Sequence, residues 1–134
     1  MKNRTKKNGS VLLVIVFAIA LMAMVTVGIL QMTTEELMLM QNQLYAAQAL
    51  VTAEAGLNDA FAEIRANSSW TTGFTDEPFN GGTYDVTVTG TLPTRTIISE
   101  GTSSQGYVAR LRTDVTVGSS APYIIRIDNL RINE

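Results

Sequence analysis

Residues 11–30 read VLLVIVFAIALMAMVTVGIL, and eighteen of these twenty residues are apolar. Only Thr26 and Gly28 interrupt the run, and no residue between Asn8 and Thr34 carries a charge. A helix rises ~1.5 Å per residue, so twenty residues reach ~30 Å, about the thickness of the hydrocarbon core of a bilayer. The stretch therefore predicts a transmembrane helix.

The charges on the two sides of this run differ in sign. Glu35 and Glu36 are the first charged residues beyond its far end, whereas no acid precedes it and four basic residues do: Lys2, Arg4, Lys6 and Lys7. Cytoplasmic flanks of membrane helices are enriched in Lys and Arg. We therefore expect a single-pass protein of the cytoplasmic membrane, with its N-terminus in the cytoplasm and residues 31–134 outside.

Three kinds of segment combine basic residues with an apolar helix. A cleaved secretory signal has an apolar core of only ~7 to 15 residues, and the run here is longer. A permanent signal anchor fits the run itself. A prepilin leader, which is cut on the cytoplasmic side while the helix is retained, fits both the run and the residues before it. Lys6, Lys7, Asn8 and Gly9 resemble the end of such a leader, with the cut between Gly9 and Ser10. Glycine suits that position because a residue without Cβ lets a peptidase approach the backbone.

Length and composition limit what lies outside the membrane. The 134 residues leave room for one membrane helix and one small domain. The chain has no cysteine and no histidine, which removes disulfides, the commonest metal ligand and the commonest general base. Removal of residues 1–9 would leave six basic and twelve acidic residues, a net charge of −6. We expect no nucleic-acid partner, no cofactor, no metal and no catalytic site, and hence no enzyme.

A helical pattern continues beyond the apolar run. Residues 31–66 contain no proline and are rich in Leu, Met, Ala, Gln and Glu, which favour helices. Apolar residues recur there at three- and four-residue steps on two neighbouring stripes. One stripe holds Leu37, Met40, Leu44, Ala47 and Val51, and the other holds Leu50, Ala53, Leu57, Ala60, Phe61 and Ile64. We predict one helix from about Ser10 to about Ala66.

The period changes to two in the last third of the chain. Alternating residues predict four strands, around Tyr84 to Thr89, Thr94 to Glu100, Tyr107 to Val117, and Tyr123 to Ile132, the last with a bulge near Asp128 and Asn129. Residues 67–82 are expected to form a loop, in which Trp70 and Phe74 cover the end of the helix or the edge of the sheet. The prediction is an α+β fold, with a leader (residues 1–9), an apolar half-helix (10–30), an amphipathic half-helix (31–66) and a small antiparallel β domain (67–134).

The predicted sheet needs a cover for its apolar face, and the second helical stripe is the only large apolar helix face outside the membrane. The residues expected in this core are Leu57, Phe61, Ile64, Tyr84, Val86, Val88, Leu111 and Val115.

Two motifs resemble type IV pilins and the related pseudopilins. GSVLLVIVFAIALM opens the helix, and QLYAAQALVTAEAGLNDAFAEI continues it with the AEAGLN-type sequence of minor pilins that have a PilX-type N-terminal region. The resemblance covers about Lys6 to Arg65. It implies a non-catalytic subunit of a type IV pilus or a type II secretion-like filament, cleavage by a prepilin peptidase, methylation of the new N-terminal Ser10, and other pilins or pseudopilins as partners. An unprocessed signal-anchored protein with a small outer β domain is the alternative.

The chain departs from this family at Val14. Major pilins usually carry a glutamate at the fifth residue after the cut, where it pairs with the N-terminal amine of another subunit. Since a buried amine without a carboxylate is costly, the resemblance implies that this subunit initiates or caps an assembly. Asp76 and Glu77 form the other pair of adjacent acids besides Glu35 and Glu36. A calcium site needs six or more oxygens, so a solvated turn is the expected role of Asp76 and Glu77.

Overall fold

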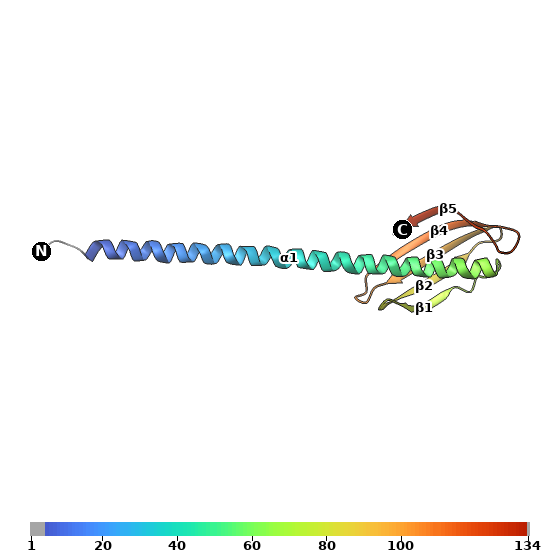
Figure 1. Cartoon of the computed structure of the whole chain (residues 1–134), viewed down its shortest axis with the longest axis horizontal. Helices are drawn as coiled ribbons and strands as arrows, with labels where there is room; N and C mark the ends of the chain where they lie inside the picture. The colour runs from blue at the N-terminus through green and yellow to red at the C-terminus, as the bar shows by residue number, and fades with distance from the viewer. Residues whose placement is uncertain (1–4, 134) are drawn as a thin grey trace. The chain divides into compact units, whose positions relative to one another are not determined.

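A computed structural model gives the structure of the protein and describes residues 5–133. One helix, α1 (Thr5–Ala66), precedes five strands: β1 (Phe74–Phe79), β2 (Gly82–Thr89), β3 (Thr94–Thr102), β4 (Val108–Val117) and β5 (Ile125–Ile132) (Figure 1). The strands form one antiparallel sheet in the order β1-β2-β3-β4-β5, and the C-terminal part of α1 packs on it. The α+β prediction is therefore confirmed.

The chain divides into two compact units, residues 1–41 and residues 42–134. In the first unit the large apolar side chains of α1 are exposed from Val11 to Met40. Of the residues that the structure describes, one helix is long and apolar enough to cross a membrane. The helix begins at Thr5 and not near Ser10, so it includes the last residues of the predicted leader. Lys2 and Arg4 lie outside the described residues.

Strands β2, β3, β4 and β5 lie where the alternation of residues predicted strands. In β4 every second residue from Ala109 to Val117 is buried, which is the face that the alternation assigned to the core. The predicted bulge in the last strand is also present. Asp114 pairs with Asn129 whereas Val115 pairs with Ile127, so Asp128 is the extra residue.

The sheet has five strands and not four, because residues 74–79 form an edge strand where we predicted a loop. Phe79 pairs with Gly82, so Asn80 and Gly81 make a two-residue hairpin turn, and both have positive φ (48° and 79°). Asn-Gly is the favoured sequence for that turn. The sequence did not predict this strand because Pro78 and a bulge at Asp76, whose φ is 51°, interrupt the alternation of residues. An edge strand tolerates proline.

The core lies between the sheet and α1. Seven of the eight residues predicted for it are buried: Leu57, Ile64, Tyr84, Val86, Val88, Leu111 and Val115. Phe61 packs against this core but is only partly buried, so it lies at the border of the core and not within it. Trp70 and Phe74 also pack against the core, with ring centroids 5.2 Å apart, and Phe74 meets Tyr84 edge-on. Trp70 follows the end of α1 and Phe74 opens the edge strand β1, so the two rings cover the core at an edge of the sheet, one of the two places expected for them.

Small residues let α1 lie directly on the sheet. A Cβ at Gly101 of β3 would lie 2.3 Å from the carbonyl oxygen of Ala49 and 2.3 Å from the amide nitrogen of Ala53. A Cβ at Gly56 would lie 2.6 Å from the ring of Tyr84. The small residues of the AEAGLN-type segment thus face the sheet, where they allow backbone-to-backbone approach.

Candidate functional site

The predicted cleavage site lies near the start of α1. Gly9 and Ser10 are both helical and exposed. A Cβ added at Gly9 would meet no atom within 4 Å, so Gly9 is not required for packing within the chain. Residues 1–4 of the predicted leader lie outside the described residues. No other part of the described chain therefore covers Gly9 or Ser10.

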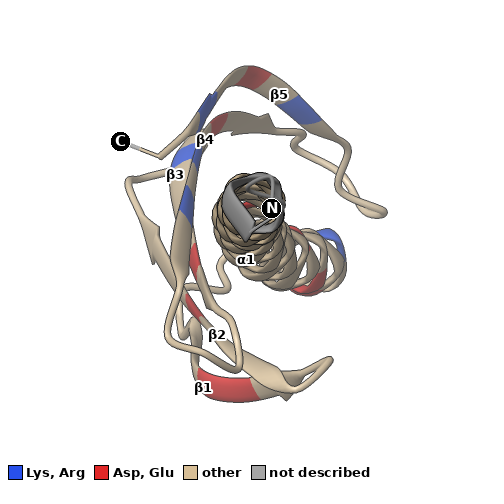
Figure 2. Cartoon of the chain, turned by 90° about the vertical axis from the view of Figure 1, so that its left-hand side faces the viewer, with Lys and Arg blue, Asp and Glu red and all other residues tan. Residues whose placement is uncertain are grey.

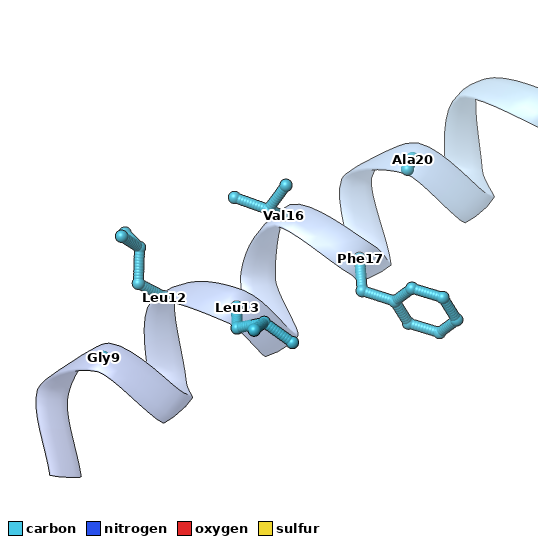
Figure 3. A pocket seen from close by; sticks show the side chains of 6 residues that line it. All are labelled: Gly9, Leu12, Leu13, Val16, Phe17 and Ala20. Carbon is cyan, nitrogen blue, oxygen red and sulfur yellow. The ribbon is translucent and has the colours of Figure 1, made fainter. Parts of the chain in front are cut away.

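The helix surface after this site is apolar. Gly9, Ala20 and the side chains of Leu12, Leu13, Val16 and Phe17 border a shallow open hollow of about 520 Å³ (Figure 3). Figure 3 shows Leu12 and Val16 on one side of the ribbon and Phe17 on another, so the hollow is the space between neighbouring turns. Val14 is exposed as well. This surface offers contacts to lipid chains or to another apolar helix, and no side chain on it can form a hydrogen bond.

Polar side chains near the end of the apolar run are satisfied within the helix. The hydroxyl groups of Thr26, Thr33 and Thr34 donate to the carbonyl oxygens four residues earlier, at distances of 2.7, 2.9 and 2.9 Å. Internal hydrogen bonds of this kind allow threonine to lie in a hydrocarbon environment. The threonines therefore do not mark a polar binding site.

Exposed apolar side chains continue well beyond residue 30. Residues 37–40, Leu-Met-Leu-Met, are between 55% and 66% exposed, and Met32, Leu44 and Val51 are exposed too. The sequence showed the stripe that ends at Val51, but its periodicity alone could not tell whether the sheet would cover it. The neighbouring stripe, through Ala53, Leu57 and Ile64, is the one that packs on the sheet.

Aromatic side chains form two separate groups within the second compact unit, residues 42–134, which we call the outer unit. Tyr107 stacks on Tyr45 with a centroid distance of 5.9 Å, and its hydroxyl donates to Asn42 at 2.6 Å. Trp70 and Phe74 instead follow the C-terminal end of α1. Since Asn42 and Trp70 are 28 residues apart along a mostly helical segment, Trp70, Phe74 and Tyr107 do not form one contact surface.

The structure places Asp76 and Glu77 on the exposed edge strand β1. The amide of Asp76 donates to Asp85 Oδ1 at 3.1 Å. Within residues 5–133 no group of three or more His, Cys, Asp or Glu side chains could hold a metal ion. These acids thus form a negatively charged sheet edge.

Two polar groups are perturbed by their surroundings. Burial raises the pKa of Tyr84 well above its usual value, and its hydroxyl donates to Asp59 of α1, which raises the pKa further. Asp128 on the bulge of β5 accepts hydrogen bonds from Thr116 and Arg126, which hold the pKa of its carboxyl below the usual range. Both interactions join neighbouring elements of the outer unit and so stabilise the fold.

Arg95 on β3 is a buried cation that the sequence did not reveal. Its guanidinium donates from Nη1 to the carbonyl oxygen of Gly90 at 2.6 Å and from Nη2 to that of Ser68 at 3.4 Å. Its Nε has no partner among the described residues. Because Ser68 follows the end of α1, where the helix dipole is negative, Arg95 holds the helix end against the sheet. Its position on a strand flanked by threonines gave no periodic signal that distinguishes a buried arginine from an exposed one.

The structure thus defines an α+β chain in which a helix of membrane-spanning length and composition continues onto an antiparallel sheet. No family model, no curated protein and no solved structure matches the chain.

Proposed function

We propose that the protein is a minor pilin or pseudopilin, a structural subunit of a type IV pilus or a type II secretion-like filament. In this role α1 spans the cytoplasmic membrane once before assembly and then packs against the helices of other subunits. The outer unit faces away from the cytoplasm. The partners are other pilins or pseudopilins, a prepilin peptidase and the membrane, and the subunit acts without a cofactor.

The observation that carries this proposal is the exposed apolar surface of α1 beyond residue 30. The run of residues 11–30 alone fills the ~30 Å of a bilayer. Residues 37–40 lie at least ~10 Å further along the helix and are still more than half exposed. Contiguous apolar surface in water marks a contact site. A neighbouring helix would cover it.

The rival function is an unprocessed signal anchor that carries a small outer domain. An anchor of this kind needs apolar residues only within the bilayer, and it has no use for Leu37, Met38, Leu39 and Met40 on its outer side. The motif at Gly9 and Ser10 also favours a processed subunit, since nothing in the described chain requires glycine there. After cleavage Ser10 would carry the free amine, which we expect to be methylated.

Val14 supports a position at the end of the filament. The amine of Ser10 would form an ion pair with a glutamate of a neighbouring subunit, but the chain has no glutamate at Val14 to offer in return. The contact is one-sided, so the subunit suits initiation or capping of an assembly better than its repeating shaft.

Cysteine cross-linking in the membrane tests the carrying observation. The chain has no cysteine, so a single substitution gives an unambiguous report. Met40→Cys should form disulfide-linked dimers with a cysteine placed at the matching height of a co-expressed pilin helix. Glu35→Cys is the matched control, because five residues turn the helix by ~140°. Equal cross-linking of Met40→Cys and Glu35→Cys, or none, would favour the signal anchor.

A further inference from the structure

A hollow of about 400 Å³, which we call the loop hollow, lies at the end of the outer unit where α1 ends. Three loops border it: Ser68 follows α1, Pro93 precedes β3, and Ser119 precedes β5. Since α1 enters the outer unit at Asn42 and rises ~1.5 Å per residue, the end of α1 lies ~36 Å from this entry. The volume of the loop hollow is within the range of small-molecule sites.

The loop hollow combines apolar walls with free hydroxyl groups. The apolar surface is formed by Leu92, Pro93, Val117 and the ring of Tyr123. The hydroxyl groups of Ser68, Ser119 and Tyr123 form no hydrogen bond with another residue among residues 5–133. A few convergent polar groups in an apolar pocket are typical of sites that orient a small ligand. These three hydroxyl groups are therefore available to such a ligand.

The three bordering loops carry no charge. Residues 67–73, 90–93 and 118–124 are eighteen residues without Lys, Arg, Asp or Glu, although the chain of 134 residues has 10 basic and 12 acidic residues, a proportion that would give about three charges here. In Figure 2 the loop that leads into β5 is tan throughout, whereas β5 itself carries both basic and acidic residues. Arg95 is buried and does not border the loop hollow. An ionised ligand would find no partner for its charge, so a neutral ligand is favoured.

The backbone beside the loop hollow is already hydrogen-bonded. The amide of Val117 donates to the carbonyl oxygen of Pro93, and the amide of Gly118 donates to that of Ile124, both at 2.8 Å. A peptide that binds by adding a strand needs a free strand edge, and these bonds occupy the backbone here. A purely apolar ligand would remove the three hydroxyl groups from water without replacing their hydrogen bonds, which costs free energy. A neutral ligand with hydroxyl groups of its own avoids both difficulties.

We propose that the loop hollow binds a neutral saccharide. A sugar ring carries C–H groups on its faces and hydroxyl groups around its edge. A face of the sugar packs on the ring of Tyr123 and on Pro93, and its hydroxyl groups exchange hydrogen bonds with Ser68 and Ser119. This binding goes beyond the proposed filament function, and a position at the end of a filament would leave the loop hollow accessible.

The detergent-solubilised full-length chain, applied to a printed array of neutral, sialylated and sulfated glycans, tests the proposal. We expect the chain to bind a group of neutral glycans, and to bind the sialylated or sulfated forms of the same glycans several-fold more weakly. Ser119→Trp should abolish binding, because the indole ring would fill the loop hollow. Ser120→Trp is the matched control, since Ser120 is the next residue, is equally exposed and does not border the loop hollow. Tyr123→Phe keeps the aromatic ring and removes the hydroxyl group, so it should weaken binding by several-fold.

Three results would overturn the proposal. The first is a folded chain, checked by circular dichroism, that binds no neutral glycan above background. The second is equal binding by Ser119→Trp and Ser120→Trp, which would place the glycan elsewhere on the chain. The third is the absence of glycan binding together with filaments that exclude Ser119→Trp and admit Ser120→Trp, which would make the loop hollow a contact for another subunit.

Discussion

The hydroxyl group of Ser99 on β3 donates a hydrogen bond of 2.7 Å to the carbonyl oxygen of Ala53 on α1, and both residues are fully buried. Two positions along the same strand, Gly101 meets the backbone of Ala49 and Ala53. The sheet thus contacts the helix backbone directly, which side chains longer than those of glycine, alanine and serine would prevent.

Gly101→Ala should therefore destabilise the outer unit. The added Cβ would lie 2.3 Å from two backbone atoms of α1, which cannot move aside as a flexible side chain could. We expect a loss of about 1–3 kcal/mol, the range of core overpacking. Denaturant unfolding of the detergent-solubilised chain, followed by Trp70 fluorescence, measures it. Gly118→Ala is the control, because the atoms nearest to its added Cβ, the backbone nitrogen and oxygen of Ile124, would lie 3.4 Å away. If the two variants had equal stability, close contact at Gly101 would be excluded.

Truncation to alanine should cost more stability at Ile64 than at Phe61. Ile64 is fully buried, so Ile64→Ala should cost ~2–5 kcal/mol. Phe61 is only partly buried, and Phe61→Ala should cost roughly half of the ~3–5 kcal/mol typical of a buried phenylalanine. The same unfolding measurement ranks them. A larger loss for Phe61→Ala would contradict the described packing of α1 on the sheet.

Asp128 should make stability depend on pH at the acid end. Hydrogen bonds from Thr116 and Arg126 lower the pKa of its carboxyl in the folded state. The resulting stabilisation is present above the unfolded pKa of about 4 and is lost as pH falls through the lower folded pKa. Asp128→Asn should therefore lower the melting temperature at pH 7. The difference from the wild type should shrink as the pH falls below about 4, and a difference independent of pH would show that the carboxylate charge is not involved.

The sequence patterns predicted most of this fold because they are regular. Strict alternation in Tyr107 to Val117 identified both the strand and its buried face, and the shift of period after Ile127 identified the bulge at Asp128. Strand β1 was missed because Pro78 and a bulge break its alternation, although Asn80 and Gly81 indicated a hairpin. The exposure of Leu44 and Val51 could not be predicted, since a helical stripe has the same period whether its cover belongs to the same chain or to another.

Cleavage of the leader is a separate prediction. Co-expression with a prepilin peptidase should shorten the chain by nine residues and leave Ser10 as a methylated N-terminus, which mass spectrometry detects. Gly9→Leu should block the cut because its side chain obstructs approach to the backbone. An intact leader beside a peptidase that cleaves a known prepilin would contradict the motif.

Val14→Glu should change where the subunit lies in a filament. A glutamate at this position would offer a carboxylate to the amine of a neighbouring subunit, which the wild-type chain cannot do. Labelled wild-type protein should be found at filament ends, and the labelled variant should also enter the shaft. Even distribution of the wild-type label along filaments would refute the capping role and leave the class of protein unaffected.

The most direct test of the filament function is the composition of filaments sheared from cells that express the tagged chain with a complete assembly system. Immunoblotting and mass spectrometry of the purified filaments should detect the chain in its form beginning at Ser10, and deletion of the assembly ATPase should return it to the cytoplasmic membrane. A full-length chain that stays in the membrane fraction while filaments assemble without it would contradict the proposed function.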